Sequence, residues 1–532
     1  MKKYFILFLL LFSAVFAQSR PEDLVGRLLL MGFRGDKAPI EQLGLFKPAG
    51  FIFYPSNITS TIHTKELISS LQAAADYPLL FSLDQEGGPF SAYRVDDATV
   101  FPSNMAIAAT KNMDFARQKG KLIGQELAYI GFNLDFSPVV DVNINPDNPI
   151  IGMRSFGANV STVAAYGMSL FKGLDESGVA AVAKHFPGHG DTVSDSHIAL
   201  PIVTGSRERL ERVELAPFKA MIAAGVPAIM TAHVIFSEFD KDYPATLSKI
   251  VLTDLLRNEL GFKGLIITDH MDMNAIAANY GAGEAAILSI LAGADLVLIG
   301  YREEKQVEVY NALLGAVKSG RIPESRLRDA IAHSSQIARY YPVNNNPPLP
   351  DYQLNKNAAQ AQALNAVTLL TNDAVLPIKK DSNLLVISPY IKRIKAVPDL
   401  AARLANYYSV ERLDVSISPS QDEINLAIEV ADKADVIVLA SYHFRGNFSS
   451  ELIGLEQKLM QTGKPLVVVA LGNPDDIRYF KIKPNAYLAT YGFDDSNLTA
   501  AARILSGNAL PRGKLPMGFP GFKIDYGLEN FE

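Results

Sequence analysis

The chain has 532 residues, of which 48% are hydrophobic and 20% are charged, and its formal net charge is −6. This length predicts two or three domains, and the acidic balance offers no general attraction for nucleic acid. The chain contains no cysteine, which excludes disulfides, thiolate metal ligands and a cysteine nucleophile.

The first 17 residues form a separate unit. Lys2 and Lys3 precede an apolar run of 13 residues (4–16). Small side chains stand at the end of this run, at Val15, and directly after it, at Ala17. This pattern is typical of a secretory signal that is cleaved after Ala17. A membrane anchor is the alternative, although 13 apolar residues are short for a membrane span. We therefore expect a secreted or periplasmic protein with no membrane span after cleavage.

Residues 18–340 alternate between short apolar runs and longer amphipathic stretches. The eight apolar runs are 28–33, 50–54, 79–83, 132–142, 179–183, 228–233, 264–268 and 295–301. Most of them lead into a polar or glycine-rich loop and then a stretch of helical period, such as 113–130 or 207–224. Repeated strand–helix units of this kind predict a (β/α)8 barrel of the TIM type.

A linker at 341–356 is predicted from the run YPVNNNPPLP at 341–350, which is too rich in proline and asparagine for regular structure. Beyond it, apolar runs recur at 384–387, 436–440, 466–471 and 486–490, and helical stretches such as 423–433 separate them. Residues 357–532 are therefore predicted to form a second, smaller domain, an α/β sandwich with a mainly parallel sheet.

Several of the predicted barrel strands run into polar residues at their carboxyl ends. These residues are Asp84, Arg154, Lys184, His185, His233 and Asp269. The carboxyl ends of all the strands in such a barrel converge on one rim, and reaction sites lie there. The sequence therefore predicts one site that contains acids, an arginine, a lysine and histidines.

The segment 184–197, KHFPGHGDTVSDSH, holds three of the eight histidines of the chain within 14 residues. Glycine and proline are interspersed among them, so we expect a tight loop rather than a helix or a strand. A histidine-rich loop directly after an apolar strand is typical of a reaction site on a rigid scaffold.

Together these motifs resemble glycoside hydrolase family 3, and specifically its β-N-acetylglucosaminidase branch. The resemblance runs from about residue 24 to residue 519, and the 184–197 pattern separates this branch from the β-glucosidases of the family. The further matching motifs are DQEGG (84–88), RSFG (154–157), GFKGLIITD (261–269) and GKLP (513–516).

The resemblance implies catalytic roles for three residues. Asp269 occupies the nucleophile position, where an ionised oxygen must attack the anomeric carbon. His197 matches the general acid/base, a role open to an imidazole because its pKa lies near neutrality, and Asp195 is its partner.

A further set of residues is implied in sugar binding: Asp84, Arg154, Lys184 and His185. We expect His189 to shape the loop. His233 and His270 either line the site or pack beneath it.

The implied reaction is a retaining exo-hydrolysis of terminal β-linked N-acetylglucosamine through a covalent glycosyl-enzyme. Peptidoglycan fragments and chitooligosaccharides are both possible substrates, and no cofactor or metal is required. The family usually has an arginine directly after the 84–88 motif, whereas this chain has Pro89 and Phe90 there. Arg94 follows about two residues too late, and we do not expect it to take over the sugar contact.

Alternatives within the family remain open. A β-glucosidase would take its acid/base glutamate from the second domain, where Glu451 is a candidate. A phosphorylase is compatible with a histidine acid/base, because neutral histidine does not repel an anion as a carboxylate would.

Two further alternatives assign the chain a function outside the glycosidases. A metal-dependent barrel hydrolase could use His185, His189, Asp191, His197 and Asp269, but the His185–His189 spacing suits a metal on a helix, which Pro187 and the neighbouring glycines disfavour. A non-catalytic glycan-binding protein of the cell envelope is the other alternative.

Overall fold

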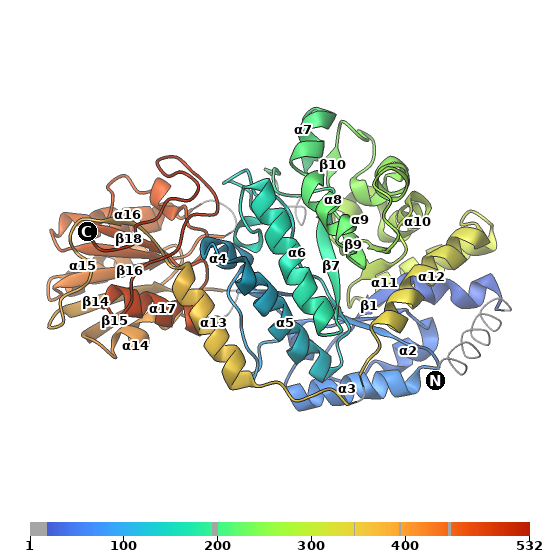
Figure 1. Cartoon of the computed structure of the whole chain (residues 1–532), viewed down its shortest axis with the longest axis horizontal. Helices are drawn as coiled ribbons and strands as arrows, with labels where there is room; N and C mark the ends of the chain where they lie inside the picture. The colour runs from blue at the N-terminus through green and yellow to red at the C-terminus, as the bar shows by residue number, and fades with distance from the viewer. Residues whose placement is uncertain (1–18, 194–199, 345, 393–394, 445–447) are drawn as a thin grey trace.

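The computed structural model describes residues 19–193, 200–344, 346–392, 395–444 and 448–532 (Figure 1). The predicted signal sequence lies outside these residues. So do Asp195 and His197, the predicted acid/base pair.

The first domain is a parallel β-barrel. Its eight-stranded sheet has the order β11-β9-β7-β6-β3-β2-β1-β12 in the described chain. A parallel bridge between Ile267 and Leu296 joins the two edges and closes the sheet. The strands are β1 (Leu29–Gly32), β2 (Gly50–Ile52), β3 (Leu80–Leu83), β6 (Leu134–Asp135), β7 (Ala180–Phe186), β9 (Ala228–Thr231), β11 (Leu265–Ile267) and β12 (Val297–Ile299). Each lies within or overlaps one of the predicted apolar runs, so the (β/α)8 prediction is confirmed.

Helices surround the barrel because each has one apolar face that packs on the strands. They are α2 (Ile40–Phe46), α3 (Thr61–Ala74), α5 (Met113–Ile130), α6 (Val160–Glu176), α8 (Leu215–Ala223), a π-helix (Ile250–Glu259), α10 (Ala282–Ala292), α11 (Glu303–Lys318) and α12 (Glu324–Tyr340). The side chains of Ser60, Asn112 and Asn159 cap the amino ends of α3, α5 and α6 by accepting backbone N–H groups. Shorter helices α4 (Asn104–Ala109), α7 (Arg207–Arg212) and α9 (Asn274–Tyr280) lie in the connections.

Two strands differ from the prediction, and both differences shape the rim. The run 132–142 pairs as β6 only at Leu134–Asp135, since Pro138 has no N–H to donate to a strand ladder. The buried segment that follows instead pairs with the end of β7, where Val140 N donates to Lys184 O at 2.8 Å. As a result β7 continues to Phe186. Lys184 and His185 therefore lie at the carboxyl end of the strand, as predicted for the rim, and the tight loop expected for 184–197 begins only after Phe186.

The second domain is an α/β sandwich around a six-stranded sheet of order β13-β18-β17-β16-β14-β15. All pairs are parallel except β13 with β18. The strands are β13 (Thr368–Asn372), β14 (Asn383–Pro389), β15 (Ser409–Val415), β16 (Val436–Ser441), β17 (Leu466–Ala470) and β18 (Ala486–Ala489). Four of them were predicted. The edge strand β15 was missed because most of its residues are polar and exposed.

Helices cover both faces of this second sheet. One apolar cluster joins it to α13 (Tyr352–Ala366), α14 (Leu400–Leu404) and α17 (Asp495–Leu505), and another joins it to α15 (Gln421–Ala431) and α16 (Ser450–Gln461). The predicted linker 341–356 begins where α12 ends at Tyr340, but its last five residues, 352–356, belong to α13, which begins at Tyr352. Figure 1 shows α13 beside α5 of the barrel and α17 of the second domain.

The GKLP motif at 513–516 lies between the two domains. Lys514 N donates to Ala109 O at 2.9 Å, and Ala158 N donates to Pro516 O at 3.1 Å. These backbone bonds tie the motif to the end of α4 and to the turn before α6, so the second domain is docked on the loops at one side of the barrel rim.

Among the described residues, no single helix has the length and hydropathy of a membrane span. Helices α9 and α10 reach the required composition only as a pair bent by 104°. Most of α10 is buried in the core of the barrel.

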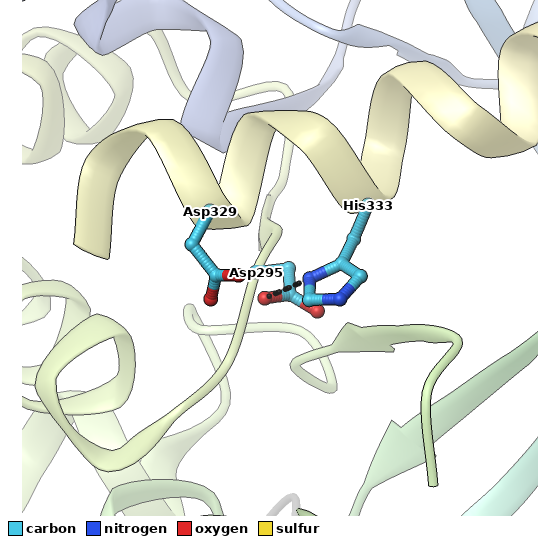
Figure 2. A group of neighbouring side chains, drawn as sticks. All are labelled: Asp295, Asp329 and His333. Carbon is cyan, nitrogen blue, oxygen red and sulfur yellow. Dashed lines mark hydrogen bonds and ion pairs between the residues drawn. The ribbon is translucent and has the colours of Figure 1, made fainter. Parts of the chain in front are cut away.

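A buried ion-pair cluster closes the opposite, amino-terminal end of the barrel. Asp295 precedes β12 and is 0% exposed. Its carboxylate accepts Arg326 Nη2 at 2.6 Å, Ile266 N at 2.9 Å and His333 Nδ1 at 3.1 Å, and also pairs with Arg257. Figure 2 shows Asp329 and His333 on α12 pointing toward Asp295. This one carboxylate therefore joins α12, the π-helix and β11.

We expect Asp295→Ala to lower the free energy of unfolding by about 3–5 kcal/mol, because it removes the buried carboxylate that Arg257 and Arg326 share and leaves Arg326 only its pair with Asp329. The control is Glu284→Ala, which removes the exposed Arg321–Glu284 pair and should cost less than about 1 kcal/mol. Calorimetric melting temperatures of the two variants measure the difference. Equal shifts would show that the cluster does not hold the barrel end.

Candidate active site

A cavity of about 660 Å³ opens at the carboxyl ends of the barrel strands. It is lined by every described residue for which a catalytic or sugar-binding role was predicted: Asp84, Arg154, Lys184, His185 and Asp269. Further polar and aromatic side chains in its wall are Tyr54, Glu86, Phe90, His189, His270, Asp272, Tyr301 and Arg302. The convergence of the strand ends therefore brings together residues that are up to 185 positions apart in the chain (Asp84 to Asp269).

Glu86 organises the cationic side of the cavity. Its carboxylate accepts Arg154 Nε at 2.9 Å and Arg154 Nη2 at 2.7 Å, and lies 2.7 Å from Lys184 Nζ. Lys184 Nζ also donates to Asp84 Oδ1 at 2.6 Å. The side chains of Glu86 and Lys184 are 2% and 1% exposed, whereas that of Asp84 is 46% exposed. Asp84 therefore presents carboxylate oxygen to the cavity while Glu86 holds the two cations from behind.

The charges of this group keep Glu86 and Lys184 ionised. Burial favours a neutral Glu86, but Arg154 and Lys184 outweigh it and hold the pKa of Glu86 far below its usual range. Burial likewise favours a neutral Lys184, but Asp84 and Glu86 raise the pKa of its ammonium group. The cavity therefore keeps fixed N–H donors and carboxylate acceptors at neutral pH, as recognition of a polyhydroxylated ligand requires.

Lys119 supports Glu86 from beneath. This fully buried side chain donates to Glu86 O at 2.6 Å, to Asn104 Oδ1 at 2.8 Å and to Pro102 O at 2.9 Å. Gly87 has φ +100°, and a Cβ there would lie 2.5 Å from Lys119 Nζ. Glycine at this position thus lets the 84–88 segment settle directly on the lysine.

Asp141 orients His185. Its Oδ2 accepts His185 Nδ1 at 2.7 Å, and its Oδ1 accepts the backbone N–H groups of His185 at 3.2 Å and His189 at 2.7 Å. Because a carboxylate only accepts, Nδ1 of His185 carries the proton, and Nε2 turns toward Arg154 Nη2 at 3.4 Å. His185 is therefore fixed in one orientation at the cavity wall.

His189 is 2% exposed, and its Nδ1 lies 2.9 Å from Thr192 Oγ1. Burial, with a further contribution from His185, lowers the pKa of His189 to about 4. A neutral ring bonded within its own loop fits the predicted loop-shaping role, although the ring also reaches the cavity.

Asp269 lies two residues beyond β11, and its Oδ1 accepts His270 N at 2.7 Å. His270 lines the cavity, and its Nε2 lies 3.1 Å from Tyr54 Oη. His233 is 0% exposed and packs beneath, where its Nε2 donates to His270 O at 3.2 Å. Burial lowers the pKa of His233 to about 4, so this support is neutral near pH 7. The sequence did not decide whether His233 and His270 line the site or pack beneath it. In the structure His270 lines the site and His233 lies under it.

Arg94 is not part of the cavity wall. It donates to Ser91 O at 3.2 Å and to Asp494 of the second domain at 2.8 Å, and also to Gly88 O. The cavity wall instead contains Phe90, whose ring lies 4.9 Å from Arg154 Cζ and 5.0 Å from the ring of Phe444. The departure from the family motif therefore brings an aromatic contact, backed by the second domain, to the arginine side of the cavity.

Sequence reasoning assigned no role to Glu86, Asp141, Lys119 or Phe90. The structure pairs Arg154 with Glu86 and Asp84 with Lys184. The sequence contained features that point to some of these residues. Glu86 belongs to a quoted motif, and Asp141 ends an apolar run, as the predicted site residues do. Lys119 lies within a helix and carried no such signal.

The histidine-rich loop gives no support for a metal centre in its described part. Among the described residues, two groups of histidine and acidic side chains have ligand atoms close enough to share an ion, and neither lies at the cavity. Asp191 pairs with Arg209 Nη2 at 2.6 Å, and the same nitrogen lies 2.9 Å from Glu214 Oε1.

Glu451, the candidate second-domain acid, is not in the cavity wall. It lies in the first turn of α16 with an exposed carboxylate that accepts Ser449 Oγ at 3.0 Å.

Comparison with known proteins places the chain in a family. The model of the glycosyl hydrolase family 3 N-terminal domain matches residues 24–337, and that of the family 3 C-terminal domain matches residues 367–530. β-Hexosaminidase A of Pseudoalteromonas piscicida is 31% identical over 90% of each chain. A β-hexosaminidase of Neisseria meningitidis is 35% identical over 50% of this chain and 75% of its own length.

A solved structure is also similar. The glycoside hydrolase family 3 β-N-acetylglucosaminidase of Paenibacillus sp. FPU-7 superimposes with a TM-score of 0.89 and 34% identity, over 94% of this chain and 99% of that one. The two family models match residues 24–337 and 367–530, and the Pseudoalteromonas and Paenibacillus proteins are similar over nearly the whole chain, so the chain belongs to glycoside hydrolase family 3.

Proposed function

We propose that this glycosidase is a retaining exo-β-N-acetylglucosaminidase. The observation that carries the proposal is a single cavity that combines Asp269, at the family's nucleophile position, with fixed acceptors and donors for a sugar ring at Asp84, Arg154, Lys184 and His185. The names of the relatives, β-hexosaminidase and β-N-acetylglucosaminidase, agree with it.

Sugar binding uses the charged wall. The half-exposed carboxylate of Asp84 accepts from hydroxyl groups of the terminal ring, and Arg154 and Lys184 donate to ring oxygens. Glu86 prevents either cation from turning toward Asp269, because it binds both of them.

The chemistry has two steps. Asp269 attacks the anomeric carbon while protonated His197 gives its proton to the departing oxygen, which forms a β-to-α inverted glycosyl-enzyme. Neutral His197 then deprotonates a water molecule that cleaves this ester and restores the β-configuration. In this proposal Asp195 orients the imidazole and favours its charged form.

The natural substrate is a peptidoglycan fragment or a chitooligosaccharide with a terminal N-acetylglucosamine. Both occur outside the cytoplasm, which is where the predicted signal sequence would send the enzyme. Phosphate in place of water in the second step would make the enzyme a phosphorylase, since neutral His197 does not repel an anion.

Substrate choice tests the proposal directly. We expect hydrolysis of an aryl β-N-acetylglucosaminide to exceed that of the matching aryl β-glucoside, with the β-anomer as first product by NMR. Faster release in phosphate, with sugar 1-phosphate formed, would assign the phosphorylase alternative. Preference for the glucoside, or the α-anomer as first product, would contradict the proposal.

Asp269→Ala should lower kcat by roughly 10⁴- to 10⁶-fold, as loss of a covalent nucleophile does, while substrate affinity stays within a few-fold. Steady-state kinetics and calorimetric binding of a chitooligosaccharide measure the two effects. Asp254→Ala on the exposed side of the π-helix is a matched control that should keep normal kcat. Near-normal turnover by Asp269→Ala would assign the nucleophile elsewhere.

His197→Ala should abolish turnover of substrates with a poor leaving group, whereas Glu451→Gln should not change it. The reason is that His197 is the proposed acid/base, while the Glu451 carboxylate lies outside the cavity wall. The comparison is kcat for a chitooligosaccharide against an activated aryl glycoside, which needs little protonation of its leaving group. The reverse result would move the acid/base to the second domain.

A further inference from the structure

Two clusters in the described chain each bring one histidine and two aspartates within 4.8 Å of one another. In the first, at Asp295, Asp329 and His333 (Figure 2), guanidinium groups already occupy the oxygens: Arg326 binds both aspartates and Arg257 binds Asp295. The buried carboxylate of this cluster is therefore already neutralised by two guanidinium groups.

The second cluster is built on adjacent parallel strands of the second domain. His443 follows β16, and Asp475 and Asp476 follow β17. Beyond the strand ends the ladder continues, with Leu471 N donating to Ser441 O at 2.8 Å and Asn473 N donating to His443 O at 2.9 Å. The backbone that carries the three side chains is therefore fixed by hydrogen bonds between the two segments.

The two carboxylates of this second cluster carry unused oxygens. Asp475 and Asp476 are both 0% exposed, and Oδ1 of each has no hydrogen-bond partner among the described residues. Oδ2 of Asp476 accepts Ser441 Oγ at 2.6 Å, and Oδ2 of Asp475 lies 2.9 Å from Arg478 Nε. Arg478 thus balances one of two buried charges. A second buried charge is costly unless a proton or another cation neutralises it.

We propose that His443, Asp475 and Asp476 form a binding site for a divalent metal ion of the zinc class. One imidazole nitrogen with two carboxylate oxygens is a donor set that suits Zn²⁺, whereas Mg²⁺ and Ca²⁺ take oxygen ligands. His443 Nδ1 lies 3.8 Å from Asp476 Oδ1. Ligands bound to one zinc at about 2.1 Å are roughly 3.4 Å apart in a tetrahedron, so a small inward movement closes the site.

The position of the site indicates a structural role at the domain junction. Asn473 Oδ1 accepts Met153 N at 3.1 Å, and Arg478 pairs with Asp147 of the barrel. Both contacts come from the short segment that contains the two aspartates, and Met153 precedes Arg154 of the cavity wall. A metal ion there would fasten the second domain to the loop that carries Arg154.

The test is metal binding by the full-length protein after treatment with a chelator. Zn²⁺ added alone should bind one equivalent by calorimetry and raise the melting temperature, with little effect from Mg²⁺ or Ca²⁺. Co²⁺ should give the visible absorption of a four-coordinate nitrogen–oxygen site. Asp476→Asn and His443→Gln should each weaken Zn²⁺ binding by more than about 100-fold, since loss of even an outer partner of a ligand costs about 10- to 100-fold.

Stability supplies a second measurement that does not depend on affinity. Without metal, Asp476→Asn should melt at or above the wild-type temperature, because it removes the buried charge that Arg478 does not balance. In the presence of Zn²⁺ the wild-type protein should instead have the higher melting temperature. A hydrogen-bonding role alone, or a proton shared by the two carboxylates, would leave the order independent of Zn²⁺ and would overturn the proposal.

Matched variants locate the bound ion. Asp329→Asn alters the guanidinium-filled cluster and should leave Zn²⁺ affinity unchanged. His185→Ala alters the cavity and should also leave it unchanged. Failure of the wild-type protein to bind Zn²⁺, or binding that survives His443→Gln but is lost in His185→Ala, would overturn the assignment.

Discussion

The carboxylate of Glu86 is buried between the guanidinium of Arg154 and the ammonium of Lys184, and these groups come from the segment after β3, the loop after β6 and the end of β7. Each charge would be costly to bury alone, and together they are stabilised by short bonds in a place with little water. This mutual dependence fixes the geometry of the rim, because movement of any member breaks at least one of these short ion pairs. Asp84 extends the network outward, so the same bonds that hold the rim also aim an acceptor into the cavity.

Support for this network comes from behind and from the side. Lys119 binds the backbone of the 84–88 segment from below, and Asp141 fixes His185 next to Arg154. On the side, the second domain contributes Phe444 against Phe90 and Asn473 against Met153. The second domain thus contacts the segments that bear the site, and among the described residues it places no carboxylate in the cavity wall. Pre-organisation of this kind is what charge-assisted recognition of a sugar needs.

Much of the fold was predictable from local pattern. The eight barrel strands and four strands of the second sheet are buried apolar runs, and such runs are visible in any sequence. The edge strand β15 was invisible because its side chains face water and its identity depends on pairing with β14. The extent of β7 was also misjudged, because its last residues pair with the irregular segment after Pro138 rather than with a regular strand.

For this chain, residue types and their order determined the fold class, the rim on which the chemistry lies and the candidate residues Asp84, Arg154, Lys184, His185 and Asp269. Tertiary structure decided which charged side chains form ion pairs with one another. It pairs Arg154 with Glu86 rather than with Asp84, and it pairs Arg94 with Asp494 of the second domain. It also places His270 in the cavity and His233 beneath it. The reason is physical: periodicity reports the faces and ends of single elements, whereas a salt bridge needs two atoms within a few ångströms, and that distance is set by how distant segments pack.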